Sequence, residues 1–458
     1  MAIQQLSLHK HQHGPTMNTL EELRTGQLSG ARKIKIASGL SEFPREIFAL
    51  ADTLEVLDLS GNALSALPDD FARLHKLRIF FASNNAFTEV PEVLGQCLAL
   101  SMVGFKSNRI RHLSGQALPA QLRWLILTDN ALTALPSDIG RCTQLQKLML
   151  AGNQLSTVPP ELAACQRLEL LRLSANRLSA LPDWLVRMPR LTWLACGGNP
   201  FGEAAETHAR HSSPIAHIAW SDLQLQQQLG EGASGIIHQA LLNTPQGPRP
   251  VAVKLFKGAV TSDGWPHTEM AISLRAGTHP QLIPAMGQIT GHPSGTQGLV
   301  MPLIDPVMRN LAGPPSMASC TRDVYAETTR FTLDSALQLA HSIASAARHL
   351  HLQGVMHGDL YAHNILHDDQ GQALLGDFGA GWLMDSTDPS TAQALQQLEV
   401  RAFGCLLEEL LDRCDVEGTP NAALAGLQNL KQQCLRETPA ERPLFEAIED
   451  WIAALRSR

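Results

Sequence analysis

Two carboxylates and an amide in the C-terminal half of the sequence have the types and spacing that phosphoryl transfer would require. Asp359 and Asn364 share the run from His357 to Asn364, and Asp377 opens an Asp-Phe-Gly sequence 18 positions after Asp359. Transfer of a phosphoryl group needs a carboxylate to orient the attacking hydroxyl and oxygen ligands to hold Mg²⁺ on the phosphates. Asp359 could supply the first, and Asn364 and Asp377 could supply the second.

Residues that could hold the phosphates lie upstream. Gly230, Gly232 and Gly235 have G-x-G-x-x-G spacing and lie between two apolar runs, a context that predicts a β-hairpin. The next apolar run ends in Lys254, which predicts a lysine at the end of a strand. A lysine that holds phosphates needs an acidic partner from a helix, and Glu269 is the best candidate for that partner.

The order of these motifs resembles that of the protein kinase family, from about residue 220 to the C-terminus. The resemblance implies that Lys254, Asp359 and Asn364 are catalytic, and that Asn364 and Asp377 bind Mg²⁺. It also implies that the strand containing Met301 lines the adenine site, with Met301 as the gatekeeper. The implied ATP-binding residues are Gly230, Gly232, Gly235, Ile237, Ala252, Lys254, Glu269, Met301 and Leu303.

Further segments fit the same resemblance. Residues 333–353 have apolar residues at helical spacing, which predicts the long helix before the catalytic loop. Glu399 stands where most kinases have an aspartate, in the helix that anchors this loop. Arg442 matches a late structural arginine whose usual glutamate partner is missing from the sequence. His357 is expected to bridge loop backbone in the core and not to bind a metal.

Three departures from the family pattern bear on regulation and specificity. Gly358 replaces an arginine that binds a phosphorylated activation loop in regulated kinases, which argues against that switch. Tyr361 and His363 stand where kinases of the two acceptor classes carry a lysine or an arginine, so the acceptor stays open, with serine or threonine favoured over tyrosine. Only 21 residues separate Asp377 from Glu399, which predicts a shortened substrate platform.

Each catalytic candidate also has an ordinary structural interpretation. A single aspartate in a loop is usually a cap, and glycine triplets usually form turns. A single lysine on a strand is usually a surface charge. The joint presence of five candidates favours an active enzyme over the alternative, a catalytically silent kinase-like scaffold used for protein interaction. These five are Lys254, Glu269, Asp359, Asn364 and Asp377.

A second pattern fills the N-terminal half. Asparagines recur every 23 residues, with one interval of 22, at Asn62, Asn85, Asn108, Asn130, Asn153, Asn176 and Asn199. Each closes a unit of spaced leucines, and this pattern resembles the short leucine-rich repeats common in bacteria. The resemblance implies one strand per repeat with inward leucines, and asparagine side chains that bond backbone groups along the stack.

Residues beside the inward leucines predict a binding surface on the concave face of the repeats. Two columns there are mostly apolar, and Phe81, Trp124, Met149 and Trp193 are residue types that suit interfaces. Since solvated repeat faces are usually polar, a protein partner is one expected cover for this surface. The kinase-like half or the N-terminal tail of the same chain is the other, and the sequence favours neither.

Composition limits the partners and the compartment. The net charge is −7 without a long basic run, so nucleic acid is not an expected partner. The sequence contains no apolar stretch of about 18 residues, so no membrane span is expected. Cys97, Cys142 and Cys165 recur at one repeat position, which predicts buried thiols in a reducing compartment. A cytoplasmic location is therefore expected, with delivery into a host cell left open.

Together these patterns predict an α/β leucine-rich-repeat solenoid followed by an α+β bilobal protein kinase fold. The expected function is transfer of the γ-phosphoryl group of ATP, with Mg²⁺, to a protein hydroxyl, while the repeats recognise a protein. The expected limits are residues 1–30 for an N-terminal tail and cap, 31–203 for the solenoid, 204–219 for a linker, and 220–458 for the kinase domain. The stretch from Gly202 to Pro214, with Glu203 and Glu206, is expected to be solvated.

Overall fold

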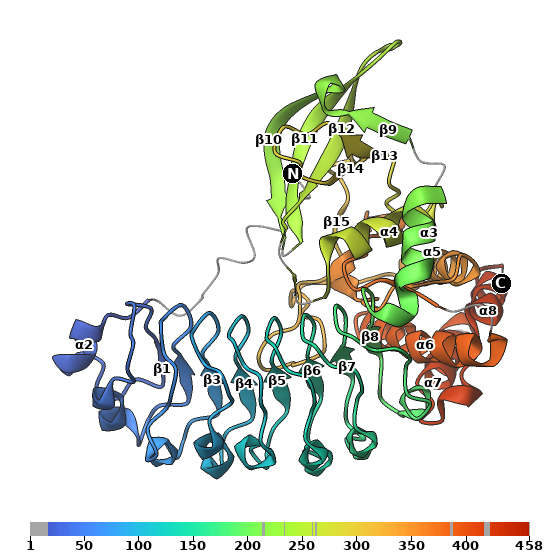
Figure 1. The fold of residues 1–458 in the computed structure, drawn as a ribbon. Helices are drawn as coiled ribbons and strands as arrows, with labels where there is room; N and C mark the ends of the chain where they lie inside the picture. Colours follow the sequence, from blue (N-terminus) through green and yellow to red (C-terminus); the bar gives the residue numbers. More distant parts are fainter. Residues whose placement is uncertain are drawn as a thin grey trace. The chain divides into compact units, whose positions relative to one another are not determined.

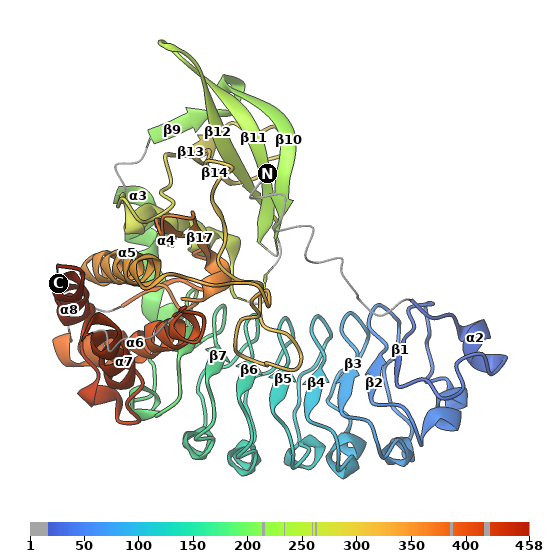
Figure 2. The same ribbon diagram turned by 180° about the vertical axis from the view of Figure 1, so that it is seen from behind.

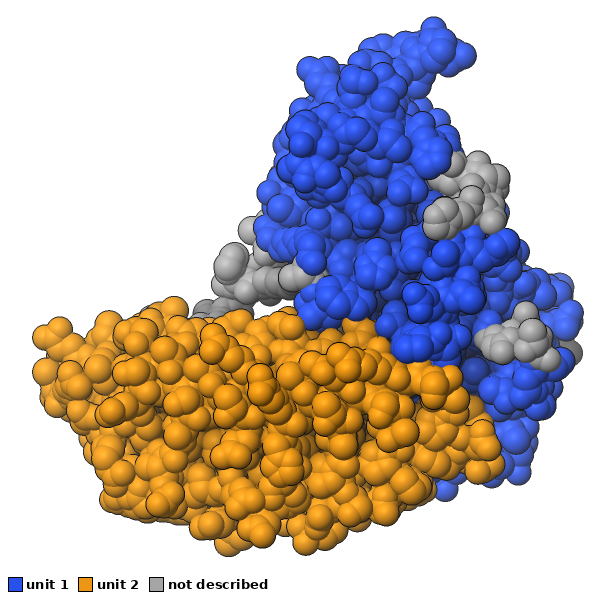
Figure 3. Space-filling model, viewed as in Figure 1, with its two compact units in different colours: residues 1–11, 189–458 blue, residues 12–188 orange. Residues whose placement is uncertain are grey.

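The computed structural model describes residues 17–212, 216–232, 234–258, 260–261, 263–384, 388–415 and 422–457, with backbone alone for residues 211 and 212. These residues form two compact units, which divide in the sequence between Met188 and Pro189 (Figure 3). We call residues 17–188 the repeat unit and residues 189–457 the C-terminal unit. Residues 1–16, which make up half of the predicted tail and cap, lie outside the described residues.

The repeat unit is a stack of short parallel strands (Figure 1). The middle residue of each strand points inward, so Leu57, Leu125 and Leu171 are buried. In chain order the strands are β1 (Lys33–Lys35), β2 (Val56–Asp58), β3 (Ile79–Phe81), β4 (Met102–Gly104), β5 (Trp124–Ile126), β6 (Lys147–Met149) and β7 (Leu170–Arg172). The intervening 3₁₀ helices are η2 (Arg45–Leu50), η3 (Phe71–Arg73), η4 (Glu92–Gln96), η5 (Gly115–Ala117), η6 (Ser137–Arg141), η7 (Pro160–Ala164) and η8 (Leu185–Arg187).

Asparagine side chains hold the turns of successive repeats together, as the sequence predicts. Asn153 Nδ2 donates to Leu127 O at 2.8 Å and to Leu150 O at 2.9 Å, while its Oδ1 accepts from Leu132 N–H at 3.0 Å. Asn176 repeats this pattern one turn later, and its Oδ1 accepts from Leu155 N–H at 3.0 Å. These amides satisfy backbone groups that form no sheet hydrogen bond. The column of asparagines therefore stabilises turns that side-chain packing alone would not fix.

A short helix, α2 (Leu20–Arg24), precedes the first strand. Thr19 caps it, since its hydroxyl accepts from Glu22 N–H and the Glu22 carboxylate accepts from Thr19 N–H. Leu23 on this helix is buried. The helix therefore covers apolar surface that the first repeat would otherwise expose.

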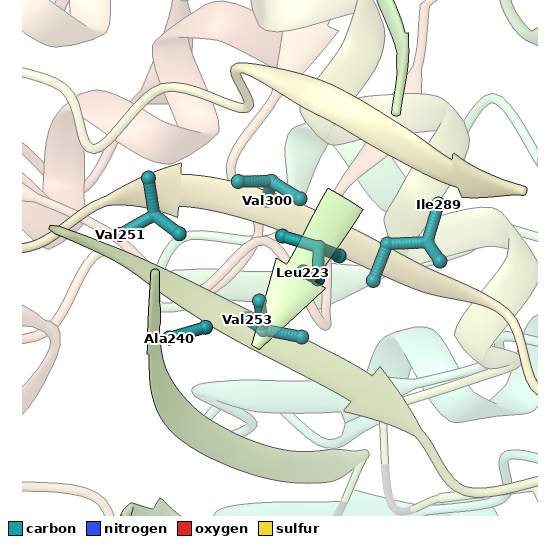
Figure 4. Packing of buried hydrophobic residues seen from close by; sticks show 6 residues of the cluster. All are labelled: Leu223, Ala240, Val251, Val253, Ile289 and Val300. Carbon is teal, nitrogen blue, oxygen red and sulfur yellow. The ribbon is translucent and has the colours of Figure 1, made fainter. Parts of the chain in front are cut away.

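The C-terminal unit contains a six-stranded sheet in the order β10–β11–β12–β14–β13–β9 (Figure 1). Alternating apolar residues of these strands pack into one core cluster, of which Val251, Val253 and Val300 are fully buried (Figure 4). The strands are β9 (Ala216–Ala219), β10 (Leu223–Glu231), β11 (Gly235–Thr244), β12 (Gly247–Phe256), β13 (Gly287–Thr290) and β14 (Gly298–Pro302), with the short helix η10 (Trp220–Asp222). The helix α4 (Pro266–Ala276) lies between β12 and β13 in the chain.

The rest of this unit is mainly helical (Figure 2). Residues 333–353 were predicted to form a long helix, and α5 (Leu333–Leu352) confirms it, with Thr332 as the N-cap. The other helices are α6 (Pro389–Leu411), α7 (Ala422–Cys434), α8 (Phe445–Arg456), η11 (Ala362–Asn364) and η12 (Pro439–Glu441). Two small sheets join them: β15 (Arg309–Asn310) with β17 (Ile365–His367) and β18 (Ala373–Leu375), and β16 (Val355–Met356) with β19 (Trp382–Leu383).

The C-terminal unit also contains chain that the sequence pattern assigns to the repeats and the linker. Strand β8 (Trp193–Ala195), the short helix η9 (Pro200–Gly202) and helix α3 (Glu203–Ser212) all belong to it. The prediction that Glu206 faces solvent is wrong, because this side chain is only 3% exposed. Helix α3 packs against α4 and turns Glu206 inward, a long-range contact that local composition does not reveal.

The remaining predictions on thiols and membranes concern single features. Cys97, Cys142 and Cys165 are buried free thiols, as the repeat pattern predicts. Among the described residues, no helix has both the length and the apolar character to cross a membrane.

Candidate active site

The glycine-rich segment closes a hairpin, as the sequence predicts. Strands β10 and β11 pair antiparallel, with Gly230 opposite Ile237. Gly232 N–H donates to Gly235 O at 2.9 Å, which narrows the turn between the strands. A side chain at Gly235 would place its Cβ 2.5 Å from Leu255 O on the neighbouring strand, so this position requires glycine.

Lys254 and Glu269 form a buried ion pair, as the sequence predicts. Lys254 lies on β12 and Glu269 on α4, and the Lys254 Nζ contacts Glu269 Oε1. Burial alone would lower the pKa of Lys254, but the carboxylates of Glu269 and Asp377 outweigh burial and raise this pKa above its ordinary value. The ammonium group therefore stays charged at neutral pH and can hold a phosphate.

Asp359 and Asn364 lie together in the loop between β16 and β17. Asn364 Nδ2 donates to Asp359 Oδ2 and to Asp359 O, both at 2.9 Å. His357 Nε2–H donates to Gly376 O at 3.0 Å, and Asp359 N–H donates to His357 Nδ1 at 3.3 Å. The buried imidazole thus bridges two loops by their backbone, which confirms the predicted role of His357.

Asp377 follows β18 in a backbone conformation that side chains seldom adopt. Its φ is +58°, in the left-handed region, and Gly379 N–H donates to Asp377 Oδ1 at 3.1 Å. The next residue, Phe378, is buried with its ring 5.5 Å from the imidazole of His357. The hydrogen bond from Gly379 N–H therefore holds one carboxylate oxygen of Asp377.

The predicted adenine-site residues lie on paired strands. Ala252 on β12 is directly opposite Met301 on β14, and Val251 is opposite Pro302. Ala252 is buried, whereas Met301 and Leu303 are half-buried. The antiparallel pairing therefore places Ala252 and Met301 side by side, so that both side chains could contact one adenine ring.

Glu399 on helix α6 anchors the loop from His357 to Asn364, which is the predicted catalytic loop. Its Oε1 accepts from Gly358 N–H at 2.7 Å, and its Oε2 accepts from His351 Nε2 at 2.8 Å. Burial would raise the pKa of Glu399, but the hydrogen bond and charge of His351 hold this pKa below its ordinary value. The extra methylene of glutamate, relative to the usual aspartate, does not prevent this anchoring role.

Tyr361 and His363 occupy the positions that depart from the family pattern. The ring of Tyr361 stacks on Trp193, with centroids 4.1 Å apart and planes at 7°, and Trp193 is only 2% exposed. His363 Nδ1 bonds to Asp323 Oδ1 at 2.7 Å. Burial would lower the pKa of His363, but the hydrogen bond and charge of Asp323 raise it.

For one residue of the predicted partner surface, the structure distinguishes between the two expected covers. Trp193 is covered by its own chain, so the intramolecular alternative holds for this residue. The other members lie in the repeat unit. The Phe81 ring extends over Gly104, since a Cβ on that glycine would lie 2.7 Å from the ring, and Lys147 Nζ lies 4.3 Å from the centre of the Trp124 ring. Met149 belongs to the next strand, β6.

Arg442 is buried, although the sequence offers no obvious partner. Its guanidinium donates to three backbone carbonyls: Arg436 O at 2.9 Å, Gln397 O at 3.1 Å and Pro189 O at 2.6 Å. Burial lowers the pKa of Arg442 to about 10. The carbonyls replace the carboxylate that the family pattern supplies, and one of them comes from the segment next to β8.

The oxygen donors of this site fit a magnesium nucleotide. Mg²⁺ prefers carboxylate and carbonyl oxygens, and Asp377 together with the amide oxygen of Asn364 would provide them. Because Asn364 Nδ2 donates to Asp359, its Oδ1 is directed away from that carboxylate. Lys254, held by Glu269, would face the phosphates of the same ligand. The residues predicted to bind ATP and Mg²⁺ are thus compatible with both.

Sequence reasoning missed several residues that hold this site in place. Asp323 binds both the backbone N–H and the ring of His363, and Trp382 Nε1 donates to Leu194 O at 3.0 Å. No local motif marks these residues, because their partners are distant in the chain. Only the shortened activation-loop sequence indicated that something else must support the loop.

Known proteins resemble both halves of the chain. Residues 223–405 match the family model of protein tyrosine and serine/threonine kinases, and the leucine-rich-repeat models match residues 53–74, 120–178 and 143–201. No membrane helix accompanies these domains among the described residues.

Individual relatives include kinases of both acceptor classes. A tyrosine-protein kinase of Spongilla lacustris is 26% identical over 51% of this chain and 70% of its own length. A probable serine/threonine-protein kinase of Dictyostelium discoideum is 24% identical over 50% of this chain, but only 28% of that relative is covered. A solved leucine-rich-repeat protein of Leptospira interrogans covers 38% of this chain at 27% identity, with a TM-score of 0.33. The chain therefore combines leucine-rich repeats with a domain of the protein tyrosine and serine/threonine kinase family.

Proposed function

We propose that the C-terminal unit is an active protein kinase, which transfers the γ-phosphoryl group of ATP to a hydroxyl of a protein. The observation that supports this most concerns two groups of residues, those expected to bind the phosphates and those expected to bind the acceptor hydroxyl and Mg²⁺. Contacts hold both groups in place. Lys254 is paired with Glu269, as phosphate binding requires, while Asn364 Nδ2 donates to Asp359 and Gly379 N–H donates to Asp377 Oδ1. A scaffold without catalysis would have no chemical need for all of these contacts together.

In this proposal each residue has one task. Lys254 holds the phosphates, and Glu269 keeps the Lys254 ammonium in place. Asp359 orients the acceptor hydroxyl and accepts its proton as the new bond forms. Asn364 and Asp377 hold Mg²⁺, which when bound neutralises part of the phosphate charge. The backbone of the glycine-rich hairpin would cover the phosphates of the same ligand with N–H groups.

We propose serine or threonine as the acceptor in preference to tyrosine. Tyrosine kinases carry an arginine four positions after the catalytic aspartate, and this chain has His363 there. Asp323 holds the Nδ1 of His363, so this ring is fixed against the loop and does not extend as an arginine would. Phosphoamino-acid analysis of the labelled product tests this choice directly.

We also propose that the repeat unit recognises a protein. Supporting residues are Phe81 on β3 and Trp124 on β5, which are half-buried on one face of the sheet, and Met149 on β6, which is buried beside them. Aromatic and methionine side chains are the types enriched at protein interfaces, and a net charge of −7 does not favour a nucleic acid as the partner.

A direct test of the proposed activity uses the purified full chain with γ-labelled ATP. Label should appear on the chain itself or on a generic substrate such as myelin basic protein, and only when Mg²⁺ is present. EDTA should remove the signal. A wild-type chain that is folded and binds ATP, yet transfers no label to any tested protein, would favour the scaffold interpretation.

Activity should not require phosphorylation of the residues between β19 and the first turn of α6. Changing Ser386, Thr387, Ser390 and Thr391 to alanine should leave peptide phosphorylation within a few-fold of wild type, since Gly358 provides no cation for a phosphate. Ser386 and Thr387 lie outside the described residues, while the Ser390 and Thr391 hydroxyls donate to Asp388 at 2.7 and 2.6 Å. Steady-state rates after phosphatase treatment provide the measurement, and a loss as large as that of an Asp359 variant would contradict this expectation.

A further inference from the structure

We propose that the end of the last repeat, residues 189–206, is a positioning element of the kinase site, in which Glu206 holds helix α4 and strand β8 holds the catalytic loop. In an activated kinase of ordinary design, a phosphorylated loop would fix these two parts. Here a segment from outside the kinase pattern takes that place. The predicted effect on turnover rests on the proposed kinase function, whereas the effect on the position of α4 does not.

Strand β8 contacts the catalytic loop on both sides of Asp359. Trp193 Nε1–H donates to Leu360 O at 3.1 Å, and the Trp193 ring stacks on Tyr361. At the preceding position, a Cβ on Gly358 would lie 2.7 Å from Leu194 O. The two departures from the family pattern at positions 358 and 361 are therefore the places where β8 touches the loop. A glycine permits the approach of the strand, and a tyrosine completes the stack.

Gly197, which follows β8, lies between helix α4 and the stretch after Gly379, where kinases have their activation segment. A Cβ on Gly197 would lie 2.6 Å from Thr268 Cγ2 and 2.9 Å from Gly381 O, so the backbone here is in close contact with both. Trp382 adds a hydrogen bond from its Nε1 to Leu194 O at 3.0 Å. The backbone from Leu194 to Gly197 thus fills the space between α4 and the stretch that follows Asp377. The relative position of these two elements decides whether Lys254 and Asp377 face one ligand.

Glu206 connects the segment to α4. Its Oε1 accepts from Gly198 N–H at 2.7 Å, and its Oε2 accepts from Thr268 Oγ1 at 3.1 Å. Thr268 directly precedes Glu269, the partner of Lys254. Since Glu206 is 3% exposed, neither hydrogen bond competes with bulk water, and loss of the carboxylate would leave a buried donor on each side without its acceptor. Glu206 therefore acts on catalysis through Glu269 and is a positioning residue.

Arg442 fixes the beginning of the same segment. Its guanidinium donates to Pro189 O at 2.6 Å, four residues before Trp193. In the family pattern this arginine binds the activation segment, which is shortened here. The structure thus assigns the arginine to the repeat end, consistent with a segment that replaces the missing part of the loop.

The experiment compares three variants of the full chain: Glu206→Ala, Glu206→Gln and Glu203→Ala. Alanine at 206 removes both acceptors, whereas glutamine keeps an oxygen for Gly198 N–H and offers an amide N–H to Thr268 Oγ1. Glu203 lies on the same helix, is exposed and provides the matched control for loss of a carboxylate. For each variant, kcat and the KM values for ATP and peptide are measured well below the unfolding temperature. Hydrogen–deuterium exchange of α4 is measured without nucleotide.

Glu206→Ala should lower kcat/KM for ATP on the order of tenfold, the effect on a rate of one lost buried contact. The KM for ATP should rise while the KM for peptide stays near wild type, because α4 acts on the phosphates through Lys254. The α4 amides should exchange faster. Glu206→Gln and Glu203→Ala should resemble wild type in both measurements. A general loss of folded protein would instead lower apparent kcat at unchanged KM.

The outcomes separate this proposal from the proposed function. If the wild-type chain is inactive but α4 exchanges faster in Glu206→Ala alone, the positioning role stands and the kinase proposal fails. If the wild type is active and Glu206→Ala matches it in KM for ATP and in exchange, the positioning role is wrong. Equal losses in Glu206→Ala and Glu203→Ala would also overturn it, since the buried hydrogen bonds would then be irrelevant.

Discussion

Replacing Asp359 or Asp377 with asparagine should abolish phosphoryl transfer while leaving thermal unfolding nearly unchanged. At Asp359 the change removes the proton acceptor but keeps a group of the same size beside Asn364 Nδ2. At Asp377 it removes the negative charge from the expected Mg²⁺ ligand, although Gly379 N–H retains an oxygen acceptor. Losses on the order of 10²–10³ in kcat or more follow from removing one such electrostatic contact from a transition state.

The matched control is Asp369→Asn. Asp369 lies in the turn after β17 and pairs with Arg309 on the surface, so the same chemical change there should have little effect on rate. Initial rates with labelled ATP and unfolding curves of all three variants provide the comparison. If Asp359→Asn retained wild-type kcat, Asp359 would not be the residue that orients the acceptor.

The second large effect is expected at Gly358. Alanine there meets two costs, the left-handed φ of +71° and a Cβ that would lie 2.5 Å from Ala380 O and 2.7 Å from Leu194 O. The first costs about 1–2 kcal/mol, and forcing extra volume into packed backbone adds roughly 1–3 kcal/mol. The carbonyls must move, and with them the loop that carries Asp359. Since a misplacement of ~1 Å can cost about 10²-fold in rate, the activity of the molecules that remain folded should fall as well as the stability.

Gly354→Ala is the control that separates the backbone strain from the contacts with Ala380 O and Leu194 O. Gly354 has a φ of +73°, yet the nearest atom to its Cβ position is Met384 O at 4.0 Å. Both variants therefore carry the same backbone strain, and the difference between them measures the steric contact alone. Chemical denaturation gives the stability difference, and peptide phosphorylation gives the activity difference. Equal behaviour of the two variants would mean that neither Ala380 O nor Leu194 O restricts the loop.

Much of the active site could be predicted from spacing because its parts are local. The glycine turn, the Lys254 strand and the run from Asp359 to Asn364 each depend on a few consecutive residues. Asp359 and Asn364, for example, are five positions apart and form a hydrogen bond, and the glycine turn joins two strands that pair directly. Glu269 could be chosen because the paired lysine needs a carboxylate on the next helix. In the repeats, the interval between asparagines fixes the strand spacing in the same direct manner.

What supports the site could not be predicted in this way, because its contacts join distant parts of the chain. Trp193 and Leu360 are 167 positions apart, and Pro189 and Arg442 are 253 apart. A missing motif, such as the partner of Arg442, shows that a role is unfilled but not which residue fills it. Glu206 illustrates the reason, since a glutamate in a polar segment is usually solvated and only the packing of α3 on α4 turns it inward.

The sequence by itself thus determined the two folds, the order of the catalytic motifs and the residues expected to face the nucleotide, because short-range geometry and periodicity specify them. The tertiary structure decided that β8 belongs with the catalytic loop, that Gly358 and Tyr361 serve this contact, and that Glu206 binds α4. Close packing is the physical reason. Which surfaces become buried together depends on the shape of the whole unit, and no local pattern of residue types encodes that shape.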